Sequence, residues 1–186
     1  MSSERPLVGG HVAVDLVNTV AWRLDPARLV DDVTDPDALV AWLRRTGLAH
    51  GKLAATERTV EEVRRLREDL YAVLFASIEQ RDPPPEAAES LRAAMLAALS
   101  RARVATIVPL RWEFEPARPA DLPVLLTLEV WRFLQFTDLT RLRQCADEGC
   151  GWLFLDASRN GSRRWCSSAD CGNRARARRH YRRARA

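Results

Sequence analysis

The 186-residue chain contains a single lysine and only three histidines, and it has no long run of apolar residues. A membrane-spanning helix needs about 18 or more consecutive apolar residues, so we expect no membrane span. The first residues, MSSERP, contain no apolar signal region, and we therefore expect the protein to stay in the cytoplasm. Thiols stay reduced in that compartment, and disulfides are rare there.

Patterns typical of catalysis are also missing. The sequence contains no Ser/His/Asp arrangement, no glycine-rich phosphate loop and no paired carboxylates suited to acid–base catalysis. The histidines, His11, His50 and His180, are scattered along the chain. We therefore predict that the protein is not an enzyme and has no catalytic residue. A pocket holding ionisable groups with shifted pKa values would favour an enzyme instead.

The charge of the chain is unevenly distributed. Residues 159–186 contain ten arginines and one acid, Asp170, and so carry a net charge of +9. Because the whole chain carries only +4, the preceding 158 residues carry −5. An acidic body followed by a strongly basic segment is typical of a protein that binds a polyanion such as nucleic acid.

Apolar spacing predicts mostly helices before the cysteine-containing segment. Hydrophobic residues make up 47% of the chain, which is enough for a core. Residues 11–20 alternate as in a strand, and 104–116 predict one or two further strands. Capping signals and apolar stripes predict helices over 36–46, 56–80, 85–103 and 125–145. The prediction is an α+β fold, with a helix-rich N-terminal domain that contains a small sheet.

All four cysteines lie in the last 42 residues, with the spacing C-x4-C-x15-C-x4-C. Two close pairs joined by such a spacer form the sequence pattern of a zinc site with four thiolate ligands. Each pair can form a tight knuckle, and a hairpin of 152–156 with 163–166 can bring the knuckles together. We predict one structural Zn²⁺ per chain, bound by Cys145, Cys150, Cys166 and Cys171.

Other uses of the four cysteines remain open. Two disulfides or four unrelated buried thiols are the simplest alternatives, and an iron–sulfur cluster or a redox switch of free thiols are others. A catalytic zinc is disfavoured, because four thiolates fill the coordination sphere. The cysteine segment has few large apolar residues, so metal binding would contribute directly to its folding. We predict domains over 1–140 and 141–186, of which chelation unfolds only the second.

The basic segment after Cys171 is predicted to form a DNA-binding helix. Ser167 or Ser168 can cap it, and the Ala and Arg residues that follow are strong helix formers. Arginines at helical spacing form two stripes, one of Arg174, Arg178 and Arg182 and one of Arg176, Arg179 and Arg183. They would bind phosphates with a steep salt dependence, and Arg and Asn can also bind base edges. The predicted DNA-binding residues are Asn173, Arg174, Arg176, Arg178, Arg179, Arg182 and Arg183.

Several other partners would suit such a helix. The alternatives are a merely solvated cationic segment, RNA, an acidic protein and an anionic membrane surface. The helix has little apolar face, which argues against membrane insertion. One finger covers a short stretch of DNA, so a specific operator would require a dimer, and the lack of heptads leaves dimerisation to the N-terminal domain.

Polar residues follow one another near the end of the strand predicted at 11–20. Asp15, Asn18 and Arg23 are predicted to bind a small-molecule effector. Alternatively, Asp15, Asn18 and Thr19 form a turn in which their side chains cap the local backbone.

The C-terminal residues resemble a known family. The letters CGNR at 171–174, together with the cysteine spacing, are similar to the CGNR-type zinc finger. The resemblance implies a treble-clef-like finger, in which a knuckle and a hairpin precede a helix that carries the last ligand. It also implies a bacterial regulator that binds DNA. The first knuckle has Ala146 and Glu148 where zinc knuckles often have proline.

The preceding part of the chain resembles the ABATE domain. The resemblance rests on two segments, VAVDLVNTVAWR at residues 12–23 and DALVAWLRRTGL at residues 37–48. The resemblance implies a stress-induced transcription regulator whose body senses a small-molecule effector. Binding to DNA and, from the short footprint of one finger, a homodimer are the further expectations. The alternative is a zinc-stabilised RNA-binding or protein-interaction module without enzymatic activity.

Overall fold

The computed structural model describes residues 5–48 and 51–185, and contacts between residues divide the chain into two compact units. The helical unit is Val33–Thr137, and the finger unit joins Met1–Asp32 to Asp138–Ala186. These bounds differ from the predicted division at residue 140, because residues 5–32 pack with the C-terminal segment. Of the three histidines, His50 lies outside the described residues.

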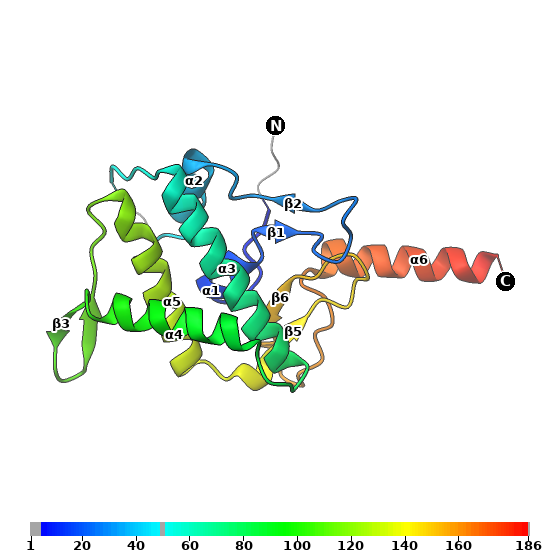
Figure 1. The fold of residues 1–186 in the computed structure, drawn as a ribbon. Helices are drawn as coiled ribbons and strands as arrows, with labels where there is room; N and C mark the ends of the chain where they lie inside the picture. The colour runs from blue at the N-terminus through cyan, green and yellow to red at the C-terminus, as the bar shows by residue number, and fades with distance from the viewer. Residues whose placement is uncertain (1–4, 49–50, 186) are drawn as a thin grey trace. The chain divides into compact units, whose positions relative to one another are not determined.

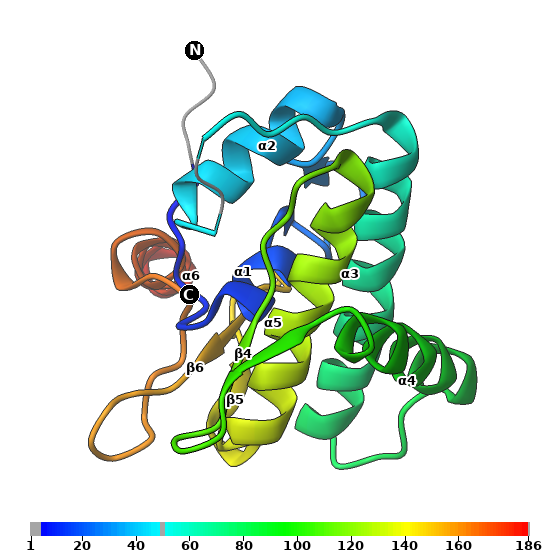
Figure 2. The ribbon, with the colours of Figure 1, turned by 90° about the vertical axis from the view of Figure 1, so that its left-hand side faces the viewer.

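The helical unit is built from helices and a small hairpin (Figure 1). Its elements are α2 Pro36–Arg45, α3 Glu57–Ile78, α4 Pro85–Leu99, α5 Leu122–Phe136, and the hairpin of β3 Arg103–Thr106 with β4 Arg111–Glu113. Helices α3, α4 and α5 pack against one another, and α2 packs on α3 (Figure 2). Fully buried leucines and Phe133 fill the space between them. No helix in the described part of the chain is long and apolar enough to span a membrane.

The capping residues predicted from the sequence start α2 and α3. The Asp35 side chain accepts a hydrogen bond from Ala38 N–H at 2.9 Å, and Pro36 occupies the first turn. Thr56 and Thr59 form a reciprocal capping box at the start of α3. The helices predicted over 36–46, 56–80 and 85–103 are therefore confirmed, with ends that differ by a few residues.

The helix predicted over 125–145 is wrong at its C-terminal end. Helix α5 stops at Phe136, where Thr137 becomes extended. The Asp138 side chain then accepts a hydrogen bond from Thr140 N–H at 3.0 Å and caps a single 3₁₀ turn, η2 Leu139–Arg141. A polar side chain that bonds its own backbone competes with helix continuation, and this ends the helix before the cysteines.

The finger unit contains short elements from both ends of the chain. They are α1 Val12–Val17, β1 Val20–Ala21, β2 Val30–Asp31, β5 Leu142–Gln144, β6 Leu153–Leu155, a π-type turn η3 Ser168–Gly172 and α6 Asn173–Ala184. Strand β1 pairs with β2 and strand β5 pairs with β6, and both pairs are antiparallel. Together with β3–β4, these two-stranded sheets confirm the predicted α+β class.

The strand predicted over 11–20 is mostly helix. His11 caps α1 by accepting a hydrogen bond from Ala13 N–H at 3.1 Å, and strand β1 begins only at Val20. Every residue from Ala13 to Val17 is buried. A short segment that is buried on all sides cannot be assigned to helix or strand from its spacing alone, which explains the error.

The predicted hairpin between the knuckles is also different. Strand β6 pairs with β5, which precedes the first cysteine, and not with 163–166. Arg163 instead bonds to the backbone: its Nε donates to Trp165 O at 3.0 Å, and its Nη2 donates to Cys166 O at 2.5 Å. The spacer therefore consists of strand β6 and a loop held by Arg163, and the first knuckle lies at the end of the β5–β6 hairpin.

Asp121 ties the start of α5 to the segments before it. Its side chain is nearly buried and accepts hydrogen bonds from Ala117 N–H at 3.0 Å and Arg118 N–H at 2.9 Å. It also pairs with Arg101. Burial by itself would raise the pKa of this carboxyl, but the hydrogen bonds and the Arg101 charge outweigh burial and lower the pKa to about 2.

This shift predicts how stability depends on pH. A carboxyl with a lowered pKa stabilises the fold above its ordinary value of 3.8, and the stabilisation is lost as pH falls towards the folded-state pKa of about 2. We expect D121N to lower the free energy of unfolding at neutral pH by about 1–3 kcal/mol, because hydrogen bonds to a charged group are lost. Denaturant unfolding at several pH values measures both effects. E113Q is the control, because Glu113 forms an exposed ion pair. The prediction would be contradicted if the free energy of unfolding of D121N and of the wild type fell equally as the pH is lowered from 3.8 to about 2.

Candidate metal centre and nucleic-acid interface

The β5–β6 hairpin presents the first two cysteines at its end. The Cys145 N–H donates to Trp152 O at 2.8 Å, and the Cys150 N–H donates to Asp147 O at 3.0 Å. Gly151 follows with a φ of +71°, a left-handed conformation that glycine adopts without strain. These bonds close a tight knuckle, as the spacing predicts.

The second pair of cysteines flanks the start of α6. The Ser167 side chain accepts a hydrogen bond from Asp170 N–H at 3.2 Å and caps the turn η3, which confirms the predicted cap. Cys166 precedes this cap, and Cys171 lies within the turn that leads into α6. The last sulfur and the first turn of the helix therefore belong to one continuous stretch of ordered backbone.

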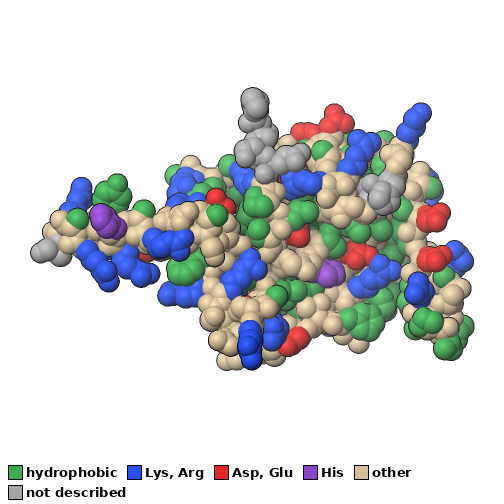
Figure 3. Space-filling view, turned by 180° about the vertical axis from the view of Figure 1, so that it is seen from behind, with side chains coloured by type: hydrophobic (Ala, Val, Ile, Leu, Met, Phe, Trp, Pro, Cys, Tyr) green, Lys and Arg blue, Asp and Glu red, His purple; other side chains and the backbone are tan. Residues whose placement is uncertain are grey.

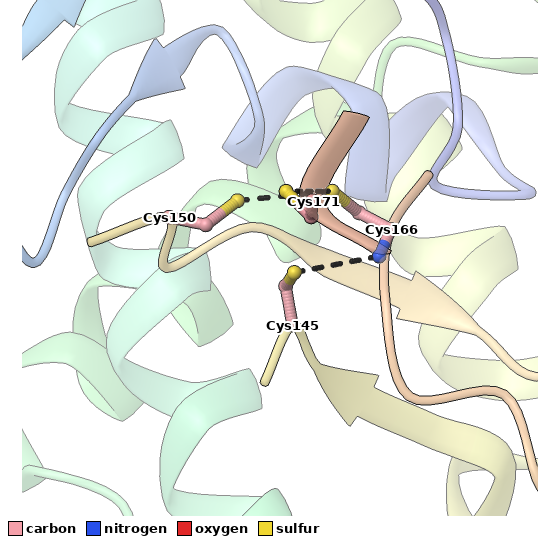
Figure 4. A group of neighbouring side chains, drawn as sticks. All are labelled: Cys145, Cys150, Cys166 and Cys171. Atoms are coloured by element: carbon pink, nitrogen blue, oxygen red, sulfur yellow. Dashed lines mark hydrogen bonds between the residues drawn. The ribbon is translucent and has the colours of Figure 1, made fainter. Parts of the chain in front are cut away.

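The four sulfurs point toward one another in the interior of the finger unit (Figure 4). The cysteines are at most 5% exposed, and their Sγ atoms lie within 4.8 Å of one another. Cys166 Sγ lies 3.7 Å from Cys150 Sγ and 3.4 Å from Cys171 Sγ. A tetrahedral site with Zn–S bonds of about 2.3 Å places sulfurs about 3.8 Å apart, whereas a disulfide requires about 2.05 Å. The donor set fits one structural Zn²⁺, and all four thiols are free of disulfides.

The protonation of these thiols also favours a bound cation. Hydrogen bonding with Cys150 and the other two thiols lowers the pKa of Cys145, whereas hydrogen bonding with Cys145 and Cys150 raises the pKa of Cys166. The directions oppose each other because each thiolate disfavours the ionisation of its neighbours. A divalent cation removes this repulsion and allows all four sulfurs to be thiolates.

The N-terminal segment completes the core around the sulfurs. Ala21 is buried in the apolar cluster that contains the four cysteines, and Trp22 packs against that cluster. The indole Nε1–H of Trp152 donates to Val20 O at 3.0 Å. The finger thus has a larger core than residues 141–186 provide alone.

The residues predicted to bind an effector form hydrogen bonds to backbone groups of the finger unit. Asn18 Nδ2 donates to Leu153 O at 2.8 Å, and its Oδ1 accepts from Leu153 N–H at 2.8 Å. Asp15 accepts from Gly9 N–H at 2.8 Å, and Arg23 donates to the last carbonyl of α1 at 3.2 Å. Thr19 Oγ1 also donates to Leu16 O at 2.7 Å, so Asp15 and Thr19 bond to nearby backbone as the structural alternative predicts, whereas Asn18 bonds to a residue 135 positions away. An effector site at Asp15, Asn18 and Arg23 stays a prediction.

One of the two predicted arginine stripes faces the first knuckle. Arg174 Nε and Arg178 Nη2 each donate to the Asp147 carboxylate at 2.9 Å. Arg182 lies 3.6 Å from Glu148, in a pair that is largely exposed. Burial would raise the pKa of Asp147, but the hydrogen bonds and charges of the two arginines lower it, so this carboxyl stays ionised.

The other stripe, Arg176, Arg179 and Arg183, is exposed. Within residues 5–48 and 51–185, no carboxylate forms an ion pair with these three arginines. Arg176 bonds instead to neutral oxygens of Asn173 and of Ser168, the latter at 3.1 Å. Figure 3 shows cationic side chains along the exposed surface of α6. The structure thus separates the seven predicted DNA-binding residues into two groups with different surroundings.

Neither Asp147 nor Trp22 is among the functional residues predicted from the sequence. Asp147 is 2% exposed and binds two arginines of α6, and Trp22 stacks on Arg174 with 4.6 Å between the guanidinium carbon and the ring centroid. An adjacent Asp–Glu pair inside a knuckle followed by a basic helix is a signal that could have identified Asp147. Trp22 carries no such signal, because its partner lies more than 150 positions away in the sequence.

Comparison with known families agrees with this geometry. The CGNR zinc finger matches residues 141–184, which include all four cysteines. ABATE, described as "Putative stress-induced transcription regulator", matches residues 10–147. The chain belongs to the ABATE family. The ABATE match begins in the N-terminal part of the finger unit, passes through the helical unit and ends beyond Cys145. No curated protein matches the chain.

The shared core predicts the effect of removing the metal. Chelation should remove hydrogen-exchange protection from β1 and β2 as well as from β5, β6 and α6, because the sulfur cluster packs with both segments. Protection in α3, α4 and α5 should persist, since that unit has its own core. Exchange measured by mass spectrometry with and without a zinc chelator tests this. Loss confined to residues after 138 would contradict it.

Proposed function

We propose that this ABATE-family chain is a transcription regulator that binds double-stranded DNA with the exposed face of α6. The observation that carries the proposal is the exposed stripe of Arg176, Arg179 and Arg183 on a helix whose preceding turn holds a metal ligand. Membership of a family described as transcription regulators supports it.

The dimensions and charge of α6 suit a duplex. The helix has 12 residues and is about 18 Å long. A helix of this kind fits the major groove of B-DNA, and arginines on it bind phosphates with release of counterions. Asn173 is engaged locally, because its Nδ2 donates to Ala169 O and its Oδ1 accepts from Arg176. Phosphate contacts are therefore the main source of affinity in this proposal.

The proposal does not involve catalysis. His11 serves as a helix cap, and the four thiols fit a structural metal. These uses support a binding protein and not an enzyme. Reduced thiols also suit the cytoplasm, where we expect the regulator to act.

The salt dependence of DNA binding tests the proposal. We expect wild-type protein to bind a mixed-sequence duplex with an affinity that falls steeply as salt rises. The triple variant R176A/R179A/R183A should bind more weakly, with a slope of log K against log salt that is smaller by about 2–3, because each lost phosphate contact removes about 0.9. The matched control is R58A/R92A/R103A, which removes three exposed arginines of the helical unit.

Three outcomes decide between the functions considered. Equal slopes for the two triple variants would overturn the assignment to α6. Equal affinity for single-stranded RNA and duplex DNA would favour the RNA-binding alternative. Loss of DNA binding on chelation, with recovery on adding zinc, is required if the metal centre supports the helix.

Dimerisation and ligand sensing are further parts of the proposal. Ile107, Val108 and Leu110 at the β3–β4 hairpin are 73%, 90% and 59% exposed, and such a group favours contact with a second copy. A dimer would extend the short footprint of one finger. A groove of about 500 Å³ between α3, α4 and α5 supports binding of a small apolar effector in the helical unit.

The dimer can be tested at the hairpin. We expect the wild-type protein to be a dimer by light scattering at micromolar concentration, and V108E/L110E to be monomeric, because charged groups would be buried in the contact. L29E is the control, since Leu29 is 50% exposed and lies in the finger unit. A monomeric wild-type protein would contradict this part of the proposal.

A further inference from the structure

Arg174 occupies the centre of a junction between three segments of the finger unit. Its Nε donates to Asp147 Oδ2 at 2.9 Å, and its Nη2 donates to Cys171 Sγ at 2.8 Å. Trp22 covers one face of the guanidinium, and Arg28 lies 3.3 Å from the centroid of the same indole ring. The guanidinium therefore contacts the first knuckle, a predicted metal ligand and the N-terminal segment at the same time.

We propose that Arg174 is a positioning residue that fixes the rotation of α6 and stabilises the Cys171 thiolate, and that it does not contact DNA. This inference deepens the proposed function and rests on it for the role of the helix. It revises the sequence prediction, in which Arg174 belonged to the DNA-binding residues. It assigns the buried Asp147 as the anchor through which Arg174 acts.

The rotation of α6 follows from the two contacts to Asp147. Arg174 and Arg178 are one helical turn apart, so their side chains leave the same face of α6, and both bind one carboxylate that is 2% exposed. At about 100° per residue, the mean directions of Arg174/Arg178/Arg182 and Arg176/Arg179/Arg183 differ by about 130°. Anchoring the first face therefore turns the second one outward.

The contact with Cys171 has a separate consequence at the metal centre. Four thiolates around a Zn²⁺ carry a net charge of about −2, and a buried site of this kind is stabilised by nearby cations and hydrogen-bond donors. Arg174 supplies both at one sulfur. A hydrogen bond to a thiolate also lowers its reactivity towards protons and electrophiles, and so should slow the release of the metal.

The surroundings of Arg174 argue against a phosphate contact. Its side chain is half-buried and bonds to Asp147, whereas Arg179 and Arg183 are exposed and form no ion pair with a carboxylate in the described part of the chain. A phosphate contact would withdraw the guanidinium from Asp147 and leave a buried carboxylate with one cation fewer. A hollow of about 220 Å³, lined in part by Trp22, Cys171 and Arg174, lies beside the buried sulfurs. The initial rate of metal transfer to a chelator therefore measures how readily the loaded site releases its metal.

The experiment compares R174A, R174K and D147N with R183A in the full-length zinc-loaded protein. The rate of zinc transfer to a colorimetric chelator should rise roughly 10- to 100-fold in R174A and less in R174K, and should be unchanged in R183A. In cobalt-loaded protein, the thiolate-to-metal charge-transfer band should move to longer wavelength in R174A and return part of the way in R174K. This spectroscopic shift reports the sulfur directly and is insensitive to a general loss of stability.

DNA binding separates the two kinds of arginine. R183A should reduce the salt slope by about 0.9, the value for one phosphate contact. R174A and D147N should weaken binding while leaving a slope closer to that of wild type. A wild-type zinc release rate in R174A, with a slope reduced as in R183A, would overturn the inference. If R174A does not fold, the same comparison with R174K decides, because lysine keeps the charge but cannot make both hydrogen bonds.

Failure of the proposed function would look different. If no form of the protein binds DNA with a salt-dependent affinity, the role of α6 as a DNA-binding helix is wrong. The zinc release rates and the cobalt spectra would still decide whether Arg174 acts on Cys171.

Discussion

The arrangement of four sulfurs within 4.8 Å of one another is the constraint on which the rest of the finger unit depends. Buried thiols at this spacing cannot all ionise unless a cation neutralises them. Once it does, the metal joins the β5–β6 hairpin to the turn that starts α6. The direction of the helix is then set by covalent chain and coordination bonds, and not by a large apolar face, which α6 lacks: none of its residues is buried.

The arginines of α6 fall into two groups, and only tertiary contacts distinguish the two groups. Asp147 neutralises part of the charge and holds one face of the helix against the first knuckle. Arg176, Arg179 and Arg183 remain exposed and form no ion pair with a carboxylate in the described part of the chain. A buried carboxylate with two guanidinium partners tolerates little change, because removing one partner leaves a charge without compensation. The same interaction that neutralises one face of α6 therefore leaves the arginines of the other face exposed.

Particular residues show why some of the fold follows from the sequence and some does not. Asp35, Thr56 and Gly47 mark helix ends by local chemistry, and helices α2 and α3 form where these residues indicate. Asp138 is also a capping residue, but the apolar spacing on either side of it is typical of a continuous helix. The helix predicted from that spacing is therefore too long. The strand predicted over residues 12–17 is wrong for a different reason. A segment that is buried on every side has no amphipathic period from which helix and strand can be told apart.

The sequence by itself determined the metal centre, the caps of the long helices and the basic character of α6. Each of these depends on residues that are close in the chain or on a spacing that chemistry requires. Only the tertiary structure decided that the N-terminal segment belongs with the finger and which arginines remain exposed. Asn18 and Leu153, for example, are 135 positions apart and exchange two hydrogen bonds. Such pairs are selected by the packing of the whole chain, and the amino-acid order around either residue contains no periodic signal for the other.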